Sequence, residues 1–256
     1  MKILEVVNNR LQEVFKDKKY HLICVAITGS HAYGINTKDS DIDIIGIFLP
    51  PEDYILRVEH IDQIITTKEK DGYDGQIFSF SKWYNLMIQQ NPNTIEILWS
   101  DENMYIYRDS EVWPKLVNNR EKFLCKKIKH SCAGYAFSQV QRMKALNIKA
   151  NQNEKRKEEI EKYGYSTKNC SHIFRLLGMA LDALIEHEIN VMRPERQFLI
   201  AIREGKYTYD EMVKMSNDKF QLIEQAYIAS DLRNKIDDKF VKELHLEILK
   251  NWLRRF

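Results

Sequence analysis

The side chains of this sequence best suited to chemistry are two aspartates separated by a single residue, Asp41 and Asp43. Alternate residues of an extended strand point to the same face, so the two carboxylates are expected to project together. At that separation they repel each other unless a divalent cation lies between them, and Mg²⁺ takes oxygen ligands of this kind. The pair therefore predicts a site for Mg²⁺, with Mn²⁺ as a second candidate.

A glycine and a serine, Gly29 and Ser30, precede this pair. A turn at these residues offers backbone N–H groups and a hydroxyl to a phosphate. Ser30 can also cap the short helix expected after it, and the two roles are compatible because a helix N-terminus attracts anions. Thr37 and Ser40 are expected to stabilise the turn before the aspartates rather than to bind a ligand. A phosphate cradle beside paired carboxylates is suited to metal-assisted phosphoryl or nucleotidyl transfer.

The full stretch GSHAYGINTKDSDIDIIGIFLPP resembles the signature of the DNA polymerase β-like nucleotidyltransferase superfamily. Within that superfamily, the sequence of this stretch is most similar to the RNA-repair-associated, RlaP-like branch. The later stretches FSFSKWYNL, QQNPNTIEILWS and YSTKNCSHIFRLL match that branch in the same order, and the resemblance covers residues 27 to 180. It implies an α+β fold, with a small mixed-sheet core like the palm of polymerase β followed by a C-terminal helical bundle.

The resemblance also implies one more carboxylate from a neighbouring strand, which binds a metal ion or activates the attacking hydroxyl. Asp74, at the edge of a strand expected near residues 75–80, is the preferred candidate, and Glu96 is its competitor. Asp41, Asp43 and Asp74 are then the expected catalytic and metal-binding residues for two ions.

A helix expected over residues 168–189 places Lys168, His172 and Arg175 on one side and apolar residues on the other. Three groups that can carry positive charge, backed by an apolar face, are suited to phosphates. In the resembling proteins this helix looks like a nucleotide clamp. Arg142, on an earlier helix, belongs to a second stripe of the same kind and completes the expected nucleotide-binding set with Gly29 and Ser30.

The elements that must position these residues change in character along the chain. Apolar spacing and β-branched runs predict a helix at 3–16, strands at 21–28, 41–49, 60–67 and 75–80, and a helix from 82. Beyond them the pattern predicts helices at 110–117, 121–148, 168–189, 195–204, 208–229 and 234–254. The polar segment 151–166 is expected to be an exposed connection. The sequence thus favours a catalytic domain at 1–110 and a helical domain at 111–256 that contributes nucleotide and acceptor binding.

Charge and composition indicate the kind of ligand and argue against a membrane protein or a zinc protein. Residues 37–74 carry ten acids against four bases, a net charge of −6, whereas residues 115–157 carry twelve bases against two acids, a net charge of +10. An acidic segment followed by a basic one suits a polyanionic ligand, although a basic run is often only a solvated helix face. No apolar run is long enough for a membrane span, and the N-terminus does not resemble a signal peptide. Four cysteines without a Cys-x-x-Cys pair suit reduced thiols in a cytoplasmic protein and argue against zinc.

The expected function is a nucleotidyltransferase of the EC 2.7.7 type, which uses Mg²⁺ to transfer a nucleoside monophosphate from a triphosphate such as ATP to an acceptor hydroxyl. The resemblance and the basic helices favour an RNA 3′ end, for example that of a tRNA. Nucleotidylation of a protein or small molecule is the second enzymatic alternative. A non-catalytic RNA- or nucleotide-binding module is the third, although a binder has no need of two adjacent repelling acids. The choice of triphosphate, the oligomeric state and the pathway are left open.

Overall fold

The computed structural model describes residues 2–144 and 154–256, except for the side chains of 138, 139, 141–144 and 154–158. The chain forms two compact units, which we call the sheet unit (Met1–Phe123 with Lys235–Phe256) and the helical unit (Leu124–Asn234). The sheet unit therefore continues past residue 110 and includes the last helix, whereas the expected helical domain began at 111 and contained it.

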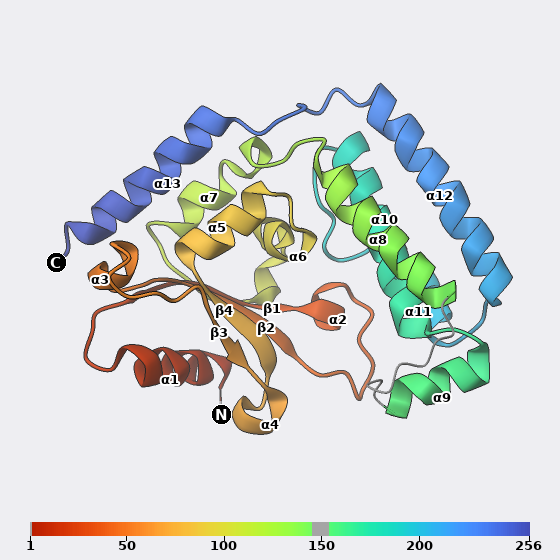
Figure 1. Cartoon of the computed structure of the whole chain (residues 1–256), viewed down its shortest axis with the longest axis horizontal. Helices are drawn as coiled ribbons and strands as arrows, with labels where there is room; N and C mark the ends of the chain where they lie inside the picture. The colour runs from red at the N-terminus through yellow and green to blue at the C-terminus, as the bar shows by residue number, and fades with distance from the viewer. Residues whose placement is uncertain (1, 145–153) are drawn as a thin grey trace. The chain divides into compact units, whose positions relative to one another are not determined.

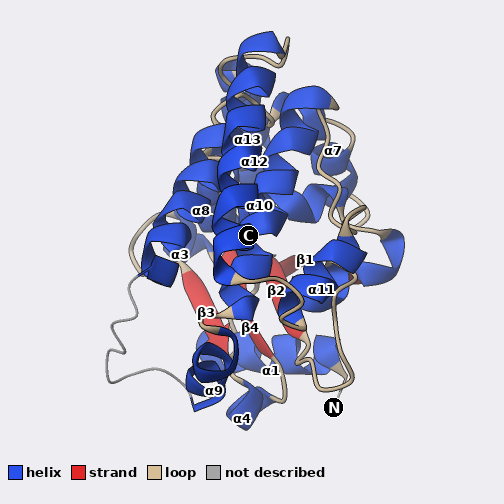
Figure 2. Ribbon diagram, turned by 90° about the vertical axis from the view of Figure 1, so that its right-hand side faces the viewer, coloured by secondary structure: helices blue, strands red, loops and turns tan. Residues whose placement is uncertain are grey.

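The sheet unit is built on one mixed five-stranded sheet with the order β3-β4-β2-β1-β5 (Figure 1). Its strands are β1 (His21–Thr28), β2 (Asp43–Leu49), β3 (Gln63–Thr66), β4 (Asp74–Ser79) and β5 (Tyr105–Arg108). Strands β2 and β4 are parallel, and the other neighbours are antiparallel. Figure 2 shows the strands of the sheet in red. The expected α+β class with C-terminal helices is confirmed.

Helix α1 (Ile3–Phe15) covers one face of this sheet. Its buried side chains recur at helical spacing, and they pack on strand residues that alternate with the opposite face. The shared core contains Ile3, Val7, Leu11, Phe15, Leu22, Val25, Ile44, Phe48, Ile64 and Ile77. This packing fixes the register of β2, because a slip of one residue would turn Ile44 and Phe48 away from the core.

Helices α5 (Phe80–Ile88) and α13 (Asp238–Leu253) lie on the other side of the sheet. Tyr84 Oη donates a hydrogen bond to the Val241 carbonyl at 2.7 Å, and Trp252 Nε1 donates to the Pro50 carbonyl at 2.8 Å. The ring of His245 stacks on that of Tyr84, with centroids 4.7 Å apart. These buried contacts explain why the last helix belongs to the sheet unit.

Short helical segments connect these elements in the sheet unit. They are α2 (Gly29–Ala32), α3 (Glu52–Ile55), α4 (Lys68–Asp71), α6 (Pro92–Ile95), α7 (Trp113–Val117), and the 3₁₀ helices η1 (Glu96–Trp99), η2 (Glu102–Met104) and η3 (Arg120–Lys122). Two of them, α2 and α4, precede or follow the strands that carry the predicted acids, and η1 begins at the competitor Glu96.

The helical unit contains α8 (Ile128–Lys144), α9 (Glu154–Tyr163), α10 (Thr167–Ile185), α11 (Arg196–Arg203) and α12 (Tyr209–Ala229). Helix α10 is its centre: it packs against α8, α11 and α12 and is buried along most of its length. The segment 151–166 was expected to be an exposed connection between helices, but its residues 154–163 form a helix of their own, α9. Glu, Lys and Arg are strong helix formers, so polarity alone did not exclude a helix there.

A buried ion-pair cluster joins α10 to the segment before α11. Arg193 is only 2% exposed, and its guanidinium contacts Asp182 Oδ2 at 2.6 Å and Glu195 Oε1 at 3.0 Å. Gly178 makes room for it, since a Cβ there would lie 2.5 Å from Arg193 Nη2. Among the described residues, no helix has the length and apolar character needed to cross a bilayer.

Candidate active site

One end of the sheet brings the predicted turn and two of the predicted carboxylates together. Strand β1 ends at Thr28, whose register partner is Asp43 at the start of β2. On the other side of β2, Asp43 is paired in register with Asp74 at the start of β4. Because β1 is antiparallel to β2 and β2 is parallel to β4, the turn at Gly29 and both carboxylates lie at the same sheet edge.

The Gly29 turn lies directly against the Asp43 carboxylate. The backbone of Gly29 has a φ of +66°, in the left-handed region that favours glycine, and a Cβ there would lie 2.1 Å from Asp43 Oδ2. The turn is closed by two backbone hydrogen bonds, from Tyr33 N to Gly29 O at 3.1 Å and from Ile35 N to Ser30 O at 3.0 Å. Glycine is therefore required at position 29 both for the backbone conformation and for the close approach of the acid.

The loop between this turn and β2 is held by the two hydroxyl residues that the sequence assigned to it. Thr37 N donates to Ser40 Oγ at 2.8 Å, and Ser40 N donates to the Thr37 carbonyl at 3.1 Å. Their predicted role as turn formers is confirmed. Strand β2 begins only at Asp43, so Asp41 lies before the strand and its side chain is exposed.

Lys68 contacts both Asp41 and Asp74. Its ammonium forms an ion pair with Asp41, and its backbone N–H donates to Asp74 Oδ1 at 2.8 Å. The hydrogen bond to Asp41, together with the charges of Asp41 and Asp74, raises the pKa of the Lys68 ammonium. Lys68 thus places a positive charge beside Asp41, at the edge where a metal ion is predicted.

The oxygen-only donor set at this edge fits a hard cation such as Mg²⁺. Asp41 has a positively charged partner at this edge, the exposed ammonium of Lys68. As the side chains stand, no three His, Cys, Asp or Glu residues in the described part of the chain are grouped closely enough to hold a metal ion. To act as the predicted metal ligand, Asp41 would have to exchange its lysine partner for the ion.

Glu96, the competing third carboxylate, lies in the protein interior. It is 3% exposed and accepts a hydrogen bond from Tyr33 Oη at 2.7 Å. Asp74 instead lies at the sheet edge as the register partner of Asp43. Of the two candidates, Asp74 is thus the one beside Asp43, and Glu96 has a partner that the sequence did not suggest.

The three residues predicted to bind phosphate on α10 do lie together in the helical unit, but they differ in exposure. Lys168 is exposed, His172 is partly exposed, and Arg175 is 2% exposed. Arg175 Nη2 lies 3.4 Å from His172 Nδ1. A guanidinium can only donate, so Nδ1 is the acceptor and the ring proton of His172 is on Nε2. Arg142 is in α8, and its side chain lies outside the described residues.

His172 is neutral at pH 7. Burial, followed by the charges of Arg175 and Lys168, lowers the pKa of His172 to about 3. The ring of Tyr135 contacts the imidazole edge-on, with the centroids 5.5 Å apart. His172 was expected to carry positive charge together with Lys168 and Arg175, but it is a neutral hydrogen-bond donor.

Residues 3–251 match the model of RlaP, described as the RNA repair pathway DNA polymerase beta family. The chain belongs to this family. The resemblance identified in the sequence is thus confirmed.

Two individual proteins are also similar to this RlaP-family chain. An uncharacterized 38.9 kDa protein of the nrdC-mobD intergenic region of Enterobacteria phage T4 is 29% identical over 120 residues, which cover 44% of this chain and 35% of the phage protein. The chain thus matches well under two thirds of that relative. A nucleotidyltransferase-like protein from Exiguobacterium sibiricum 255-15, solved at 1.90 Å, aligns over 88% of this chain and 75% of its own, with 8% identity and a TM-score of 0.32.

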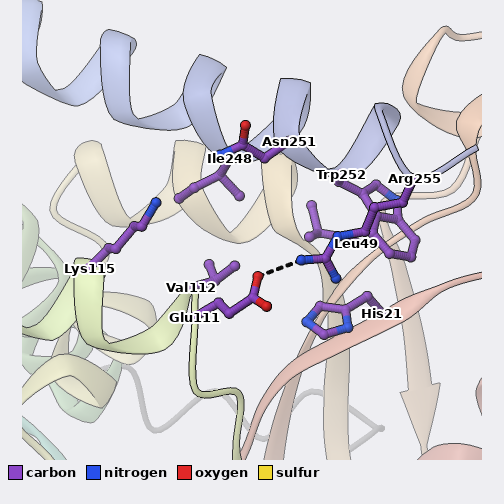
Figure 3. Close-up of a pocket in the computed structure, with 9 residues that line it drawn as sticks. All are labelled: His21, Leu49, Glu111, Val112, Lys115, Ile248, Asn251, Trp252 and Arg255. Carbon is purple, nitrogen blue, oxygen red and sulfur yellow. Dashed lines mark hydrogen bonds and ion pairs between the residues drawn. The ribbon is translucent and has the colours of Figure 1, made fainter.

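A pocket in the sheet unit of this RlaP-family protein lies at the other end of β1 and β2 (Figure 3). His21, the first residue of β1, and Leu49, the last residue of β2, line it. An ion pair between Arg255 and Glu111 crosses it. None of the predicted site residues lines this pocket, so it is separate from the edge that carries Asp43 and Asp74.

Proposed function

We propose that this RlaP-family protein transfers a nucleoside monophosphate from a nucleoside triphosphate, with ATP the first candidate, to the 3′ hydroxyl of an RNA, most simply a tRNA. The observation that supports this best is the convergence of the Gly29 turn, Asp43 and Asp74 at one edge of the sheet. In the reaction, the acceptor oxygen forms a bond to the α-phosphorus and the bond to the bridging oxygen breaks. Pyrophosphate leaves, and the acceptor loses its proton.

Asp41, Asp43 and Asp74 would hold two Mg²⁺ or Mn²⁺ ions. Bound there, such ions neutralise the triphosphate and lower the pKa of the attacking hydroxyl. Asp74 has a second role as the acceptor of the hydroxyl proton. The Gly29 and Ser30 backbone N–H groups bind the β- and γ-phosphates, whose negative charge must be stabilised as pyrophosphate departs.

The helical unit supplies contacts to the nucleotide or the acceptor in this proposal. Lys168 is exposed and can form an ion pair with a phosphate, and His172 can donate a hydrogen bond through Nε2. Arg175 is buried, so it supports His172 rather than reaching a ligand directly. Arg142 remains a further proposed contact from α8.

The test is transfer from each labelled triphosphate in the presence of Mg²⁺ and either total RNA or whole-cell lysate, comparing Asp41→Asn and Asp43→Asn with Asp39→Asn. Loss of a metal-binding carboxylate removes several kcal/mol of transition-state stabilisation, so transfer should fall about a thousandfold or more. Asp39 is an exposed acid of the same segment and its substitution controls for the lost charge. Wild-type rates in both site variants would refute the assignment, and label in a protein or small molecule would replace RNA as the acceptor.

A further inference from the structure

A buried hydrogen bond joins the phosphate-binding turn to a distant segment. Tyr33 is 9% exposed and Glu96 is 3% exposed, and the hydroxyl of the tyrosine donates to the carboxylate at 2.7 Å. The two residues are 63 positions apart, and Glu96 begins the 3₁₀ helix η1. A buried carboxylate is costly unless it is well hydrogen-bonded, so its presence here calls for a reason beyond packing.

The tyrosine is rigidly connected to the turn. Tyr33 directly follows the short helix α2, and its backbone N–H donates to the Gly29 carbonyl at 3.1 Å. Gly29 in turn lies against the carboxylate of Asp43, so close that a single added methyl group would overlap Oδ2. A displacement of Tyr33 would therefore move the turn relative to the acid that the reaction requires.

We propose that Glu96 is a positioning residue. Through the Tyr33 hydroxyl it holds the Gly29–Ser30 turn in place beside Asp43, and it binds neither metal nor substrate. The proposal rests on the function proposed above, because it assumes that the turn binds the triphosphate. It also assigns different roles to the two candidates for the third carboxylate: Asp74 acts at the sheet edge, and Glu96 acts behind the turn.

The test compares three single substitutions with matched chemistry. Tyr33→Phe removes one hydroxyl and leaves the ring in place. Glu96→Gln keeps an acceptor oxygen for that hydroxyl but removes the charge. Tyr105→Phe is the control, because the Tyr105 hydroxyl donates to the Ile97 carbonyl of the same 3₁₀ helix at 2.5 Å without reaching the turn.

Three quantities separate positioning from ligation and from general stability: the dissociation constant of Mn²⁺ measured by electron paramagnetic resonance, the dissociation constant of the triphosphate measured by calorimetry, and the melting temperature. Tyr33→Phe should weaken triphosphate binding about tenfold, the effect of losing one hydrogen bond to a charged group, and leave Mn²⁺ binding unchanged. Glu96→Gln should bind triphosphate better than Tyr33→Phe, because the amide oxygen still accepts the bond. Tyr105→Phe should lower the melting temperature only.

Two results would overturn the proposal. Loss of Mn²⁺ binding in Glu96→Gln to the extent seen in Asp43→Asn would make Glu96 a metal ligand. Equal effects of Tyr33→Phe and Tyr105→Phe on triphosphate binding would make the buried bond merely structural. Triphosphate binding by a wild-type protein that transfers to no acceptor would refute the proposed function alone, since the positioning role is read from binding.

Discussion

In both the sheet unit and the helical unit, charged side chains pack closely against a glycine, but the charge is partly exposed in the first and buried in the second. At Gly29 the neighbour is the Asp43 carboxylate, which is partly exposed at the sheet edge and has further acids beside it. At Gly178 the neighbours are Arg193 and Glu195, which neutralise each other, and the guanidinium is 2% exposed. The same close packing on a glycine therefore leaves a charged group accessible at the proposed site in one unit and buries a neutralised ion pair in the other.

The largest effect is expected for a substitution in the sheet unit, Gly29→Ala. Gly29→Ala would place a methyl group 2.1 Å from Asp43 Oδ2 and strain a backbone with a φ of +66°. A displacement of about 1 Å in a catalytic site costs roughly a hundredfold in rate, so transfer measured with labelled triphosphate should fall by at least about that factor.

Gly72→Ala is the matched control for this substitution. Gly72 also has a positive φ, +82°, but a Cβ there meets nothing within 4 Å. It carries the same kind of backbone strain without the clash, so transfer should stay near the wild-type rate. Equal losses in the two variants would show that strain in the chain, rather than contact with Asp43, explains the requirement for glycine.

The second prediction concerns stability in the helical unit. Gly178→Ala would bring a methyl group to 2.3 Å from Glu195 Oε1, and such overpacking typically lowers the free energy of unfolding by about 1–3 kcal/mol. Gly134→Ala on α8 meets no atom within 4 Å and should instead raise it by up to about 1 kcal/mol through helix propensity. Urea unfolding followed by circular dichroism measures both. An unchanged or raised free energy of unfolding in Gly178→Ala would mean that the ion-pair cluster tolerates the added methyl group.

The third prediction is a pH dependence of stability in the helical unit, and it concerns the charge carried by α10. His172 has a pKa of about 3 in the folded protein, below its usual 6.5. The unfolded chain therefore binds a proton that the folded chain does not, and the contribution of His172 to stability is complete above pH 6.5 and decreases as the pH falls toward 3. In His172→Gln the free energy of unfolding should fall less steeply across that range.

An NMR titration of the imidazole tests the same point directly. Lys168→Gln should raise the pKa of His172, because the lysine charge is one cause of its depression. A titration midpoint near pH 6.5 for the wild-type imidazole would contradict a neutral His172 at pH 6. Helix α10 would then carry three positive charges at that pH.

The sequence predicted the local elements well where one segment carries its own pattern. Strands β1 and β2 and helix α1 were expected within two residues of their observed ends, because each has a continuous apolar run or helical spacing. Strand β5 was missed. It is four residues long with no buried position, so only its pairing with β1 makes it a strand.

The candidate site was predictable in part for the same reason. The turn at Gly29 and the acids Asp41 and Asp43 lie within one stretch of chain, and Asp74 begins β4, the strand that pairs with β2. The partner of Glu96 was not predictable, because it is 63 residues away, and the neutral state of His172 depends on burial that spacing does not show.

By itself, the sequence determined the family, the first four strands of the sheet and the candidate acids, because short-range patterns and motif spacing carry this information. Only the tertiary structure decided which acid is a register partner of Asp43, which is buried behind the turn, and that α13 packs with the sheet. Those outcomes depend on contacts between residues far apart in the chain, where burial and pairing change what the same side chain can do.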